Sequence, residues 1–129
     1  MKLIRALLLT VAAFAFAGQA DADDELKLSN KWRIEVSEGA NSDGTILFRV
    51  TPKDGQAVDV PVAIKDGRGE NGVAQDIRDG FRKALDPKVF TAETDDGEDV
   101  LVKKHKGPDF EVKLVESTVK GVRINIEEE

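Results

Sequence analysis

The stretch NGVAQDIRDGFRKALDP, residues 71–87, decides the fold, because here the apolar residues change from a period of two to a helical period. One stripe of the predicted helix carries Val73, Ile77, Phe81, Ala84 and Leu85. Asn71 is the predicted N-cap, since an asparagine side chain can accept a hydrogen bond from a free amide of the first turn. The helix is expected to end at Asp86, because a residue before proline avoids the α-region. Gly80, inside the helix, predicts close packing against a sheet, since it has no Cβ.

On both sides of this helix, apolar residues alternate with more polar ones, which is typical of strands with one buried face. The alternating stretches lie around residues 32–36, 46–50, 58–64, 90–92, 100–102, 110–114 and 122–126. Asp-Gly dipeptides at 43–44, 54–55 and 96–97 predict hairpin turns, because glycine accepts a positive φ. The first three stretches are therefore predicted to form an antiparallel meander. The third is expected at a sheet edge, because Pro61 cannot donate a ladder hydrogen bond.

The order β-β-β-α-β-β-β-β predicts an α+β domain, with a mainly antiparallel sheet of about seven strands and one helix packed on one face. This single domain is expected to cover residues 31–129, after a flexible lead-in over residues 21–30. Trp32 shares the phase of the apolar residues in its strand, and this phase favours the core over an outward position in which it would anchor a ligand or a protein partner.

The start of the chain has the layout of a secretory signal peptide, predicted to cover residues 1–20. Two basic residues precede the apolar run Ala6–Ala17, which is shorter than the roughly 20 residues of a membrane span. Small residues follow the run, and cleavage after Ala22 is the alternative to cleavage after Ala20. We therefore expect a periplasmic or secreted bacterial protein that has no membrane anchor after cleavage.

The composition narrows the classes of partner. Removing the predicted signal peptide leaves 17 basic and 25 acidic residues, a net charge of −8. Such a charge disfavours binding to nucleic acid and to anionic lipid, since both are held by basic side chains. The chain has no cysteine, which excludes disulfides and thiolate metal sites. No cofactor, catalytic residue or metal ligand is assigned.

The first candidate site is the loop Gly67–Gly72, with the sequence GRGENG. It matches the G-x-G-x-x-G pattern, whose backbone amides can hold a phosphate at the start of a helix. A dinucleotide-binding fold is not expected, because the preceding strand is partly polar and no further helices alternate with the later strands. The candidate that is left is an anion or ligand loop formed by Arg68, Gly69 and Asn71.

The second candidate site is the acidic hairpin around residues 96–97. Asp95, Asp96 and Glu98 carry the oxygen ligands that calcium prefers. The EF-hand pattern is absent, and strand alternation sends neighbouring carboxylates to opposite faces. A solvated hairpin tip is the alternative interpretation.

Three hypotheses for function follow. The first is a non-enzymatic envelope protein that binds another protein or an envelope component, since an exposed strand edge can dock an extended segment. The second is a periplasmic protein that binds a small ligand or an ion through the Gly67–Gly72 loop or the acidic hairpin. The third is a small hydrolase built on His105, the only histidine, whose lysine-rich surroundings favour an exposed loop instead. The sequence does not identify the partner.

Overall fold

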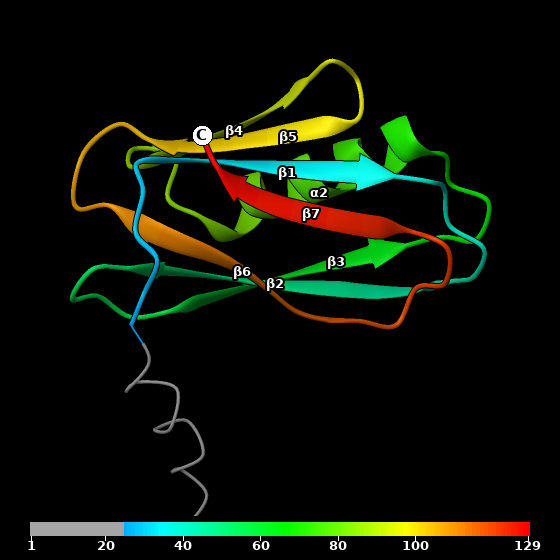
Figure 1. The fold of residues 1–129 in the computed structure, drawn as a ribbon, viewed down its shortest axis with the longest axis horizontal. Helices are drawn as coiled ribbons and strands as arrows, with labels where there is room; N and C mark the ends of the chain where they lie inside the picture. Colours follow the sequence, from blue (N-terminus) through cyan, green and yellow to red (C-terminus); the bar gives the residue numbers. More distant parts are fainter. Residues whose placement is uncertain (1–24) are drawn as a thin grey trace, which may run out of the picture.

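The computed structural model describes residues 25–129 (Figure 1). The predicted signal peptide, both cleavage positions and the first residues of the predicted lead-in lie outside the described residues. The elements are β1 (Lys31–Ser37), β2 (Gly44–Pro52), β3 (Val58–Ile64), α2 (Glu70–Ala84), β4 (Phe90–Asp95), β5 (Asp99–Lys104), β6 (Phe110–Ser117) and β7 (Arg123–Glu128). The predicted α+β class and the order β-β-β-α-β-β-β-β are confirmed. In residues 25–129, no helix has the length and apolar character needed to cross a membrane.

The strands form two antiparallel sheets that face each other across a shared core. One sheet has the order β4-β5-β1-β7, and the other has the order β3-β2-β6. The predicted meander is wrong at its first connection, because β1 pairs with β5 and β7 and not with β2. The Asp54-Gly55 turn joins β2 to β3, and the Asp96-Gly97 turn joins β4 to β5, as the two dipeptides predicted.

The segment between β1 and β2 explains the failed prediction. Instead of closing a hairpin, residues 38–43 carry the chain from one sheet to the other. The backbone N–H of Ala40 donates to the carbonyl of Arg68, and that of Asn41 donates to the carbonyl of Lys120. These bonds tie the crossover to the loop before α2 and to the β6–β7 connection.

The apolar faces of both sheets meet in the core. Trp32 is 3% exposed, which confirms its predicted burial, and its Nε1 donates a 2.9 Å hydrogen bond to the carbonyl of Phe110. The indole therefore links β1 of one sheet to β6 of the other. The ring of Phe48 on β2 lies 5.2 Å from the ring of Phe81 on α2, between centroids, so the helix belongs to the same core.

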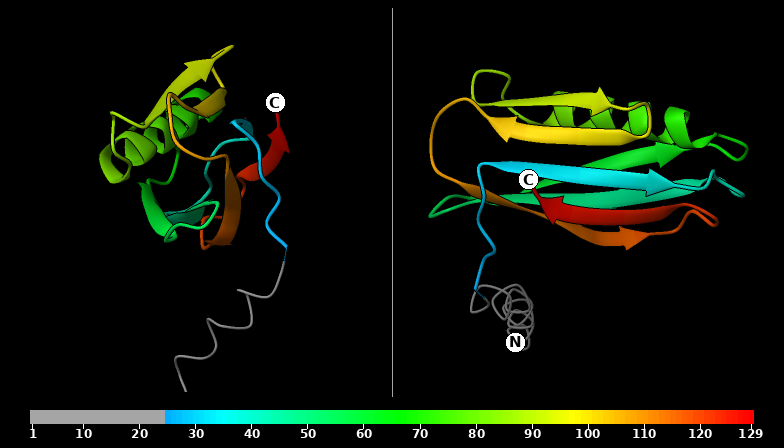
Figure 2. Two further views of the ribbon diagram at one scale, coloured as in Figure 1. Left: turned by 90° about the vertical axis from the view of Figure 1, so that its left-hand side faces the viewer. Right: turned by 45° about the horizontal axis from the view of Figure 1, so that its top comes forward.

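The helix covers one side of the sandwich, where it contacts β3 of one sheet and β4, β5 and β1 of the other (Figure 2). Its predicted N-cap is wrong, because the helix begins at Glu70 and Gly69 is the N-cap residue. The Glu70 carboxylate accepts a hydrogen bond from the backbone N–H of Glu38, so the start of the helix is fixed by a tertiary contact. A Cβ at Gly80 would lie 2.8 Å from Cγ2 of Val62, which confirms the predicted close packing.

The sheets have four edge strands, and these lie in two pairs. β3 and β4 flank the helix, and β3 is an edge strand as Pro61 predicted. β6 and β7 lie side by side on the other side of the sandwich, together with residues 25–30 (Figure 2). The two pairs differ in how their backbone groups are satisfied.

Candidate functional site

The outer edge of β6 presents backbone groups that no described strand pairs with. Phe110 exchanges both of its backbone hydrogen bonds with Ser29, at 3.0 Å each, so its N–H and C=O point away from β2. In an antiparallel ladder this orientation recurs at every second residue. Val112 and Leu114 therefore also direct their N–H and C=O groups away from β2, and β6 has no strand partner there within residues 25–129.

The outer edge of β7 also presents backbone groups that no described strand pairs with. The backbone N–H of Glu129 donates to the carbonyl of Lys31, which sets the hydrogen-bonded pairs of the β1–β7 ladder. The alternate residues Ile124 and Ile126 then direct their backbone groups away from β1. In the described part of the chain no strand pairs with β7 on this side. The two open edges lie next to each other, on strands joined by residues 118–122.

We call the gap between these edges the β6–β7 seam. It is a cavity of about 520 Å³, lined by Lys27, Trp32, Glu111, Val112, Lys113, Leu114, Ile126, Glu127 and Glu128. Four of these residues are apolar and come from both sheets, and the others are charged. Leu114 and Val115 are 38% and 40% exposed, and among the described residues they are the large hydrophobic side chains most open to solvent. The seam therefore combines an apolar lining with unpaired strand edges.

Residues before β1 close one end of the seam. Ser29 forms its bridge with Phe110, and the backbone N–H of Lys27 donates to Oε2 of Glu111 at 3.0 Å. Glu111 is 7% exposed, and this hydrogen bond satisfies its carboxylate. The seam is thus open at Leu114, beyond the point where residues 27–29 end their contact with β6, whereas Val112 is only 3% exposed.

The other two edges are covered. Pro61 removes one backbone donor from β3, and α2 packs along that strand. On β4, the backbone N–H of Phe90 donates to the carbonyl of Asp86, and the carbonyl of Ala92 accepts from Nε of Arg82 at 2.8 Å. An incoming strand would have to displace these contacts, so the β6–β7 seam is the place where a strand can be added without disrupting the fold.

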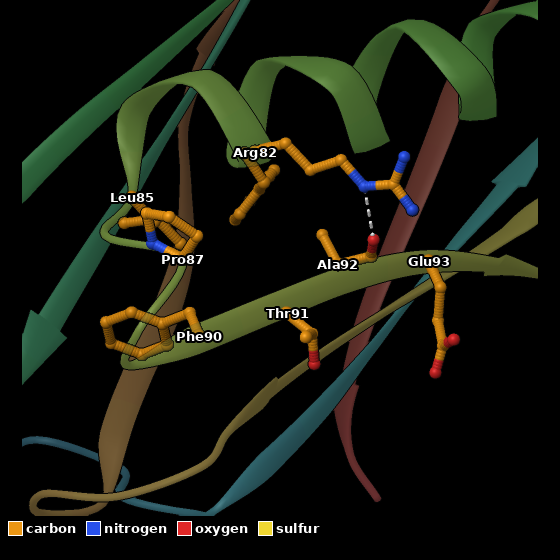
Figure 3. A pocket seen from close by; sticks show the side chains of 8 residues that line it. Arg82, Leu85, Pro87, Phe90, Thr91, Ala92 and Glu93 are labelled. Carbon is orange, nitrogen blue, oxygen red and sulfur yellow. Dashed lines mark hydrogen bonds between the residues drawn. The ribbon is translucent and has the colours of Figure 1, made fainter.

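A second cavity lies between the C-terminal end of α2 and β4, and we call it the α2–β4 pocket (Figure 3). It has a volume of about 290 Å³ and is lined by Phe81, Arg82, Leu85, Pro87, Phe90, Thr91, Ala92 and Glu93. Its walls are mainly apolar, and Arg82 extends from the helix across its mouth toward β4. No sequence motif pointed to this pocket, because its residues come from two elements that meet only in the fold.

In the predicted anion loop, the guanidinium of Arg68 is already paired with a carboxylate of the protein. Nε and Nη2 of Arg68 donate to the two carboxylate oxygens of Asp76 at 3.0 and 3.1 Å, and these hydrogen bonds raise the pKa of Arg68. Gly69 is the N-cap residue in extended conformation. Asn71 lies in the first turn, where its side chain faces Gly97 of the acidic hairpin. The fold thus brings the two predicted sites next to each other.

In the acidic hairpin, the carboxylates that flank the turn are bound to Arg33. Arg33 contacts Asp95 at 3.1 Å and Asp99 at 2.7 Å. Asp96 lies at the turn with a positive φ of 54°, and the carbonyl of Glu98 accepts from the N–H of Val36. Among residues 25–129, no group of three or more histidine, aspartate or glutamate side chains is placed to hold a metal ion.

His105 lies on the exposed loop after β5. Its backbone N–H donates to the carbonyl of Val89 at 2.6 Å, while its side chain makes no hydrogen bond or ion pair within residues 25–129. The described contacts therefore do not join this imidazole to a serine or to a carboxylate, as a hydrolytic triad would require.

Comparison with protein-family models, with curated proteins and with solved structures finds no match for this chain. The sequence pattern predicts an exposed strand edge but does not point to β6 or β7. A signal was present at Leu114 and Val115, two neighbouring apolar residues that break the alternation of the strand. The structure places a register shift of the β2–β6 ladder at this point.

Proposed function

We propose that this protein is an exported, non-enzymatic binding module that holds an extended segment of another protein in the β6–β7 seam. The observation that carries the proposal is the pair of open strand edges above an apolar lining. A segment that enters the seam gains backbone hydrogen bonds from Leu114 on β6 and from Ile126 on β7, and its alternate side chains cover the exposed leucine. Backbone pairing supplies affinity in this mode, and the pockets for alternate side chains supply specificity.

The charges near the seam favour a basic partner segment. Three carboxylates and two ammonium groups line the cavity, which gives the lining a net charge of −1. Glu111 is buried, and Nζ of Lys27 lies 3.9 Å from Oε2 of Glu128. The net charge of −8 expected for the exported protein acts in the same direction and increases the rate of encounter with a cationic partner. The expected occupant is therefore an extended segment in which apolar residues alternate with basic ones.

A photo-crosslinking experiment tests the proposal. A photoreactive amino acid replaces Val115 beside the seam, and in a control protein it replaces Leu101, a half-buried residue of β5 away from the seam. Both proteins are irradiated in a periplasmic extract, and the trapped segments are sequenced by mass spectrometry. We expect one or a few defined segments at position 115, with the alternating pattern, and none of them at position 101.

The backbone contribution is tested by repeating the crosslinking at position 115 in a Leu114→Pro background and in a Leu114→Ala background, which removes the same side chain but keeps the N–H. Leu114→Pro removes an N–H that faces the seam and leaves the ladder with β2 intact, so trapping should be lost in this protein, but not in Leu114→Ala, while the fold is kept. Equal trapping at positions 115 and 101, or trapping that persists in the Leu114→Pro protein, would contradict the proposal.

A further inference from the structure

The α2–β4 pocket contains an arginine whose charge is not used by the fold. Five arginines of the described residues have a carboxylate oxygen within 3.9 Å: Arg33, Arg49, Arg68, Arg78 and Arg123. Arg82 is the exception within residues 25–129, and its one protein partner is the carbonyl of Ala92. Acidic residues outnumber basic ones in this chain, so each arginine is expected to find a carboxylate partner. The lack of one at Arg82 therefore distinguishes this pocket within residues 25–129.

The hydrogen bond to Ala92 holds the guanidinium in a fixed position. Nε donates to the carbonyl of Ala92 at 2.8 Å, so both Nη groups are left without a protein partner in the described residues (Figure 3). Two Nη groups in a planar fork match the geometry of a carboxylate. The lining carboxylate, Glu93, points away from Arg82 and lies 3.5 Å from Nζ of Lys103. It therefore does not compete for Arg82.

The rest of the pocket is suited to an apolar group. Leu85, Pro87 and Phe90 form an apolar wall at one end of the pocket, and the guanidinium of Arg82 lies at the other end, beside Ala92 (Figure 3). Phe81 also lines the pocket. A volume of about 290 Å³ is at the lower end of the range for ligand pockets, so the pocket fits a short chain or a single ring. The pocket thus has one cationic group at its mouth and an apolar interior.

We propose that the α2–β4 pocket binds a small monocarboxylate with an apolar tail, with the carboxylate on Arg82 and the tail against Leu85, Pro87 and Phe90. A peptide strand is not the occupant, because the contacts of Phe90 with Asp86 and of Ala92 with Arg82 cover the β4 edge. This site is independent of the β6–β7 seam.

Calorimetric titration with octanoate tests the proposal, with octan-1-ol and acetate as ligands that lack the charge or the tail. We expect saturable binding of octanoate at least tenfold tighter than that of octan-1-ol, and no binding of acetate. Arg82→Gln should weaken octanoate at least tenfold and leave octan-1-ol unchanged. The matched control is Arg78→Gln, one turn earlier on the same helix and paired with Asp79, which should bind octanoate like the wild type.

Amide chemical shifts locate the ligand. Octanoate should perturb the amides of Leu85, Phe90 and Ala92 and leave those of Val112 and Leu114 in the seam unchanged. The proposal is overturned if octanoate does not saturate, if Arg82→Gln and Arg78→Gln bind it equally, or if the perturbed amides lie in the seam. Since Arg82 is exposed and bonded only to one carbonyl, Arg82→Gln is expected to stay folded, which its thermal transition will verify.

Discussion

At the scale of single residues, Arg33 joins segments that lie far apart in the sequence. Its guanidinium contacts Asp95 and Asp99 of the β4–β5 hairpin and Glu129 beyond β7, and its side chain is 19% exposed. The hydrogen bonds to Glu129 and to Asp99 raise the pKa of Arg33, and the bond from Arg33 lowers the pKa of Glu129. One arginine thus ties both outer strands of this sheet to its central strands.

This lowered pKa predicts an acid-dependent stability. A carboxyl group whose folded-state pKa is below its unfolded value stabilises the protein above the unfolded pKa, and that stabilisation is lost as the pH falls through the folded pKa. Glu129→Gln should therefore be less stable than the wild type near about pH 7, and the difference should shrink at an acidic pH, as the pH falls through the lowered pKa of Glu129. Urea unfolding at the two pH values measures this, with Glu127→Gln as the control, since Glu127 bonds Asn125 instead of an arginine. A difference that is constant with pH would contradict the role of Glu129.

At the scale of elements, the helix shows what periodicity can and cannot predict. The apolar stripe correctly predicted the buried residues Val73, Ile77, Phe81 and Leu85. The predicted N-cap failed, because the start of the helix is set by Glu70 reaching the backbone of Glu38, a contact between segments that the local sequence does not reveal. Tertiary contacts decide the ends of this helix, while the hydrophobic pattern decides its buried face.

Phe81→Ala tests how much this buried face contributes. Phe81 is fully buried and packs on the ring of Phe48, so its truncation leaves a cavity and should cost about 3–5 kcal/mol of unfolding free energy. Chemical denaturation measures the loss, and Lys83→Ala on the exposed face of the same helix should be close to neutral. A loss for Phe81→Ala below about 1 kcal/mol would mean that the stripe does not anchor the helix.

A pair of proline substitutions in β6 tests the assignment of the open edge. Lys113 pairs with Arg49 at a hydrogen-bonded position of the β2–β6 ladder, whereas the N–H of the next residue, Leu114, faces the seam. Lys113→Pro should therefore be less stable than Leu114→Pro by at least about 2 kcal/mol, because only Lys113→Pro breaks the ladder and orphans its partner. Urea denaturation of the two variants gives the comparison. Equal losses of stability would contradict the assignment of the Lys113 N–H to the β2–β6 ladder and of the Leu114 N–H to the seam.

At the scale of the whole molecule, the sequence predicted the class and the number of strands but not their division into two sheets. Alternation indicates that each strand has one buried face, and this holds equally for a single covered sheet and for two facing sheets. The division depends on the crossover at Ala40 and Asn41, whose backbone bonds reach Arg68 and Lys120, residues distant in the sequence. The seam was unpredictable for the same reason, since an open edge exists only once every other strand has found its partner.

The open seam also predicts how the molecule avoids pairing with itself. Exposed strand edges favour edge-to-edge association unless charged side chains keep other chains away, and Lys113 and Glu127 supply such charges beside the seam. The double variant Lys113→Val, Glu127→Val should therefore self-associate at protein concentrations where the wild type does not, as measured by sedimentation velocity. Its control is the double variant Glu93→Val, Lys103→Val, which removes a salt bridge from the β4–β5 ladder. There both strands are paired and the outer edge of β4 is covered, so this control should sediment like the wild type.

If both double variants associate equally, surface apolarity alone is responsible and the seam is no special template. If neither does, the edges of β6 and β7 are not accessible to another strand, and the proposed mode of partner binding fails with them.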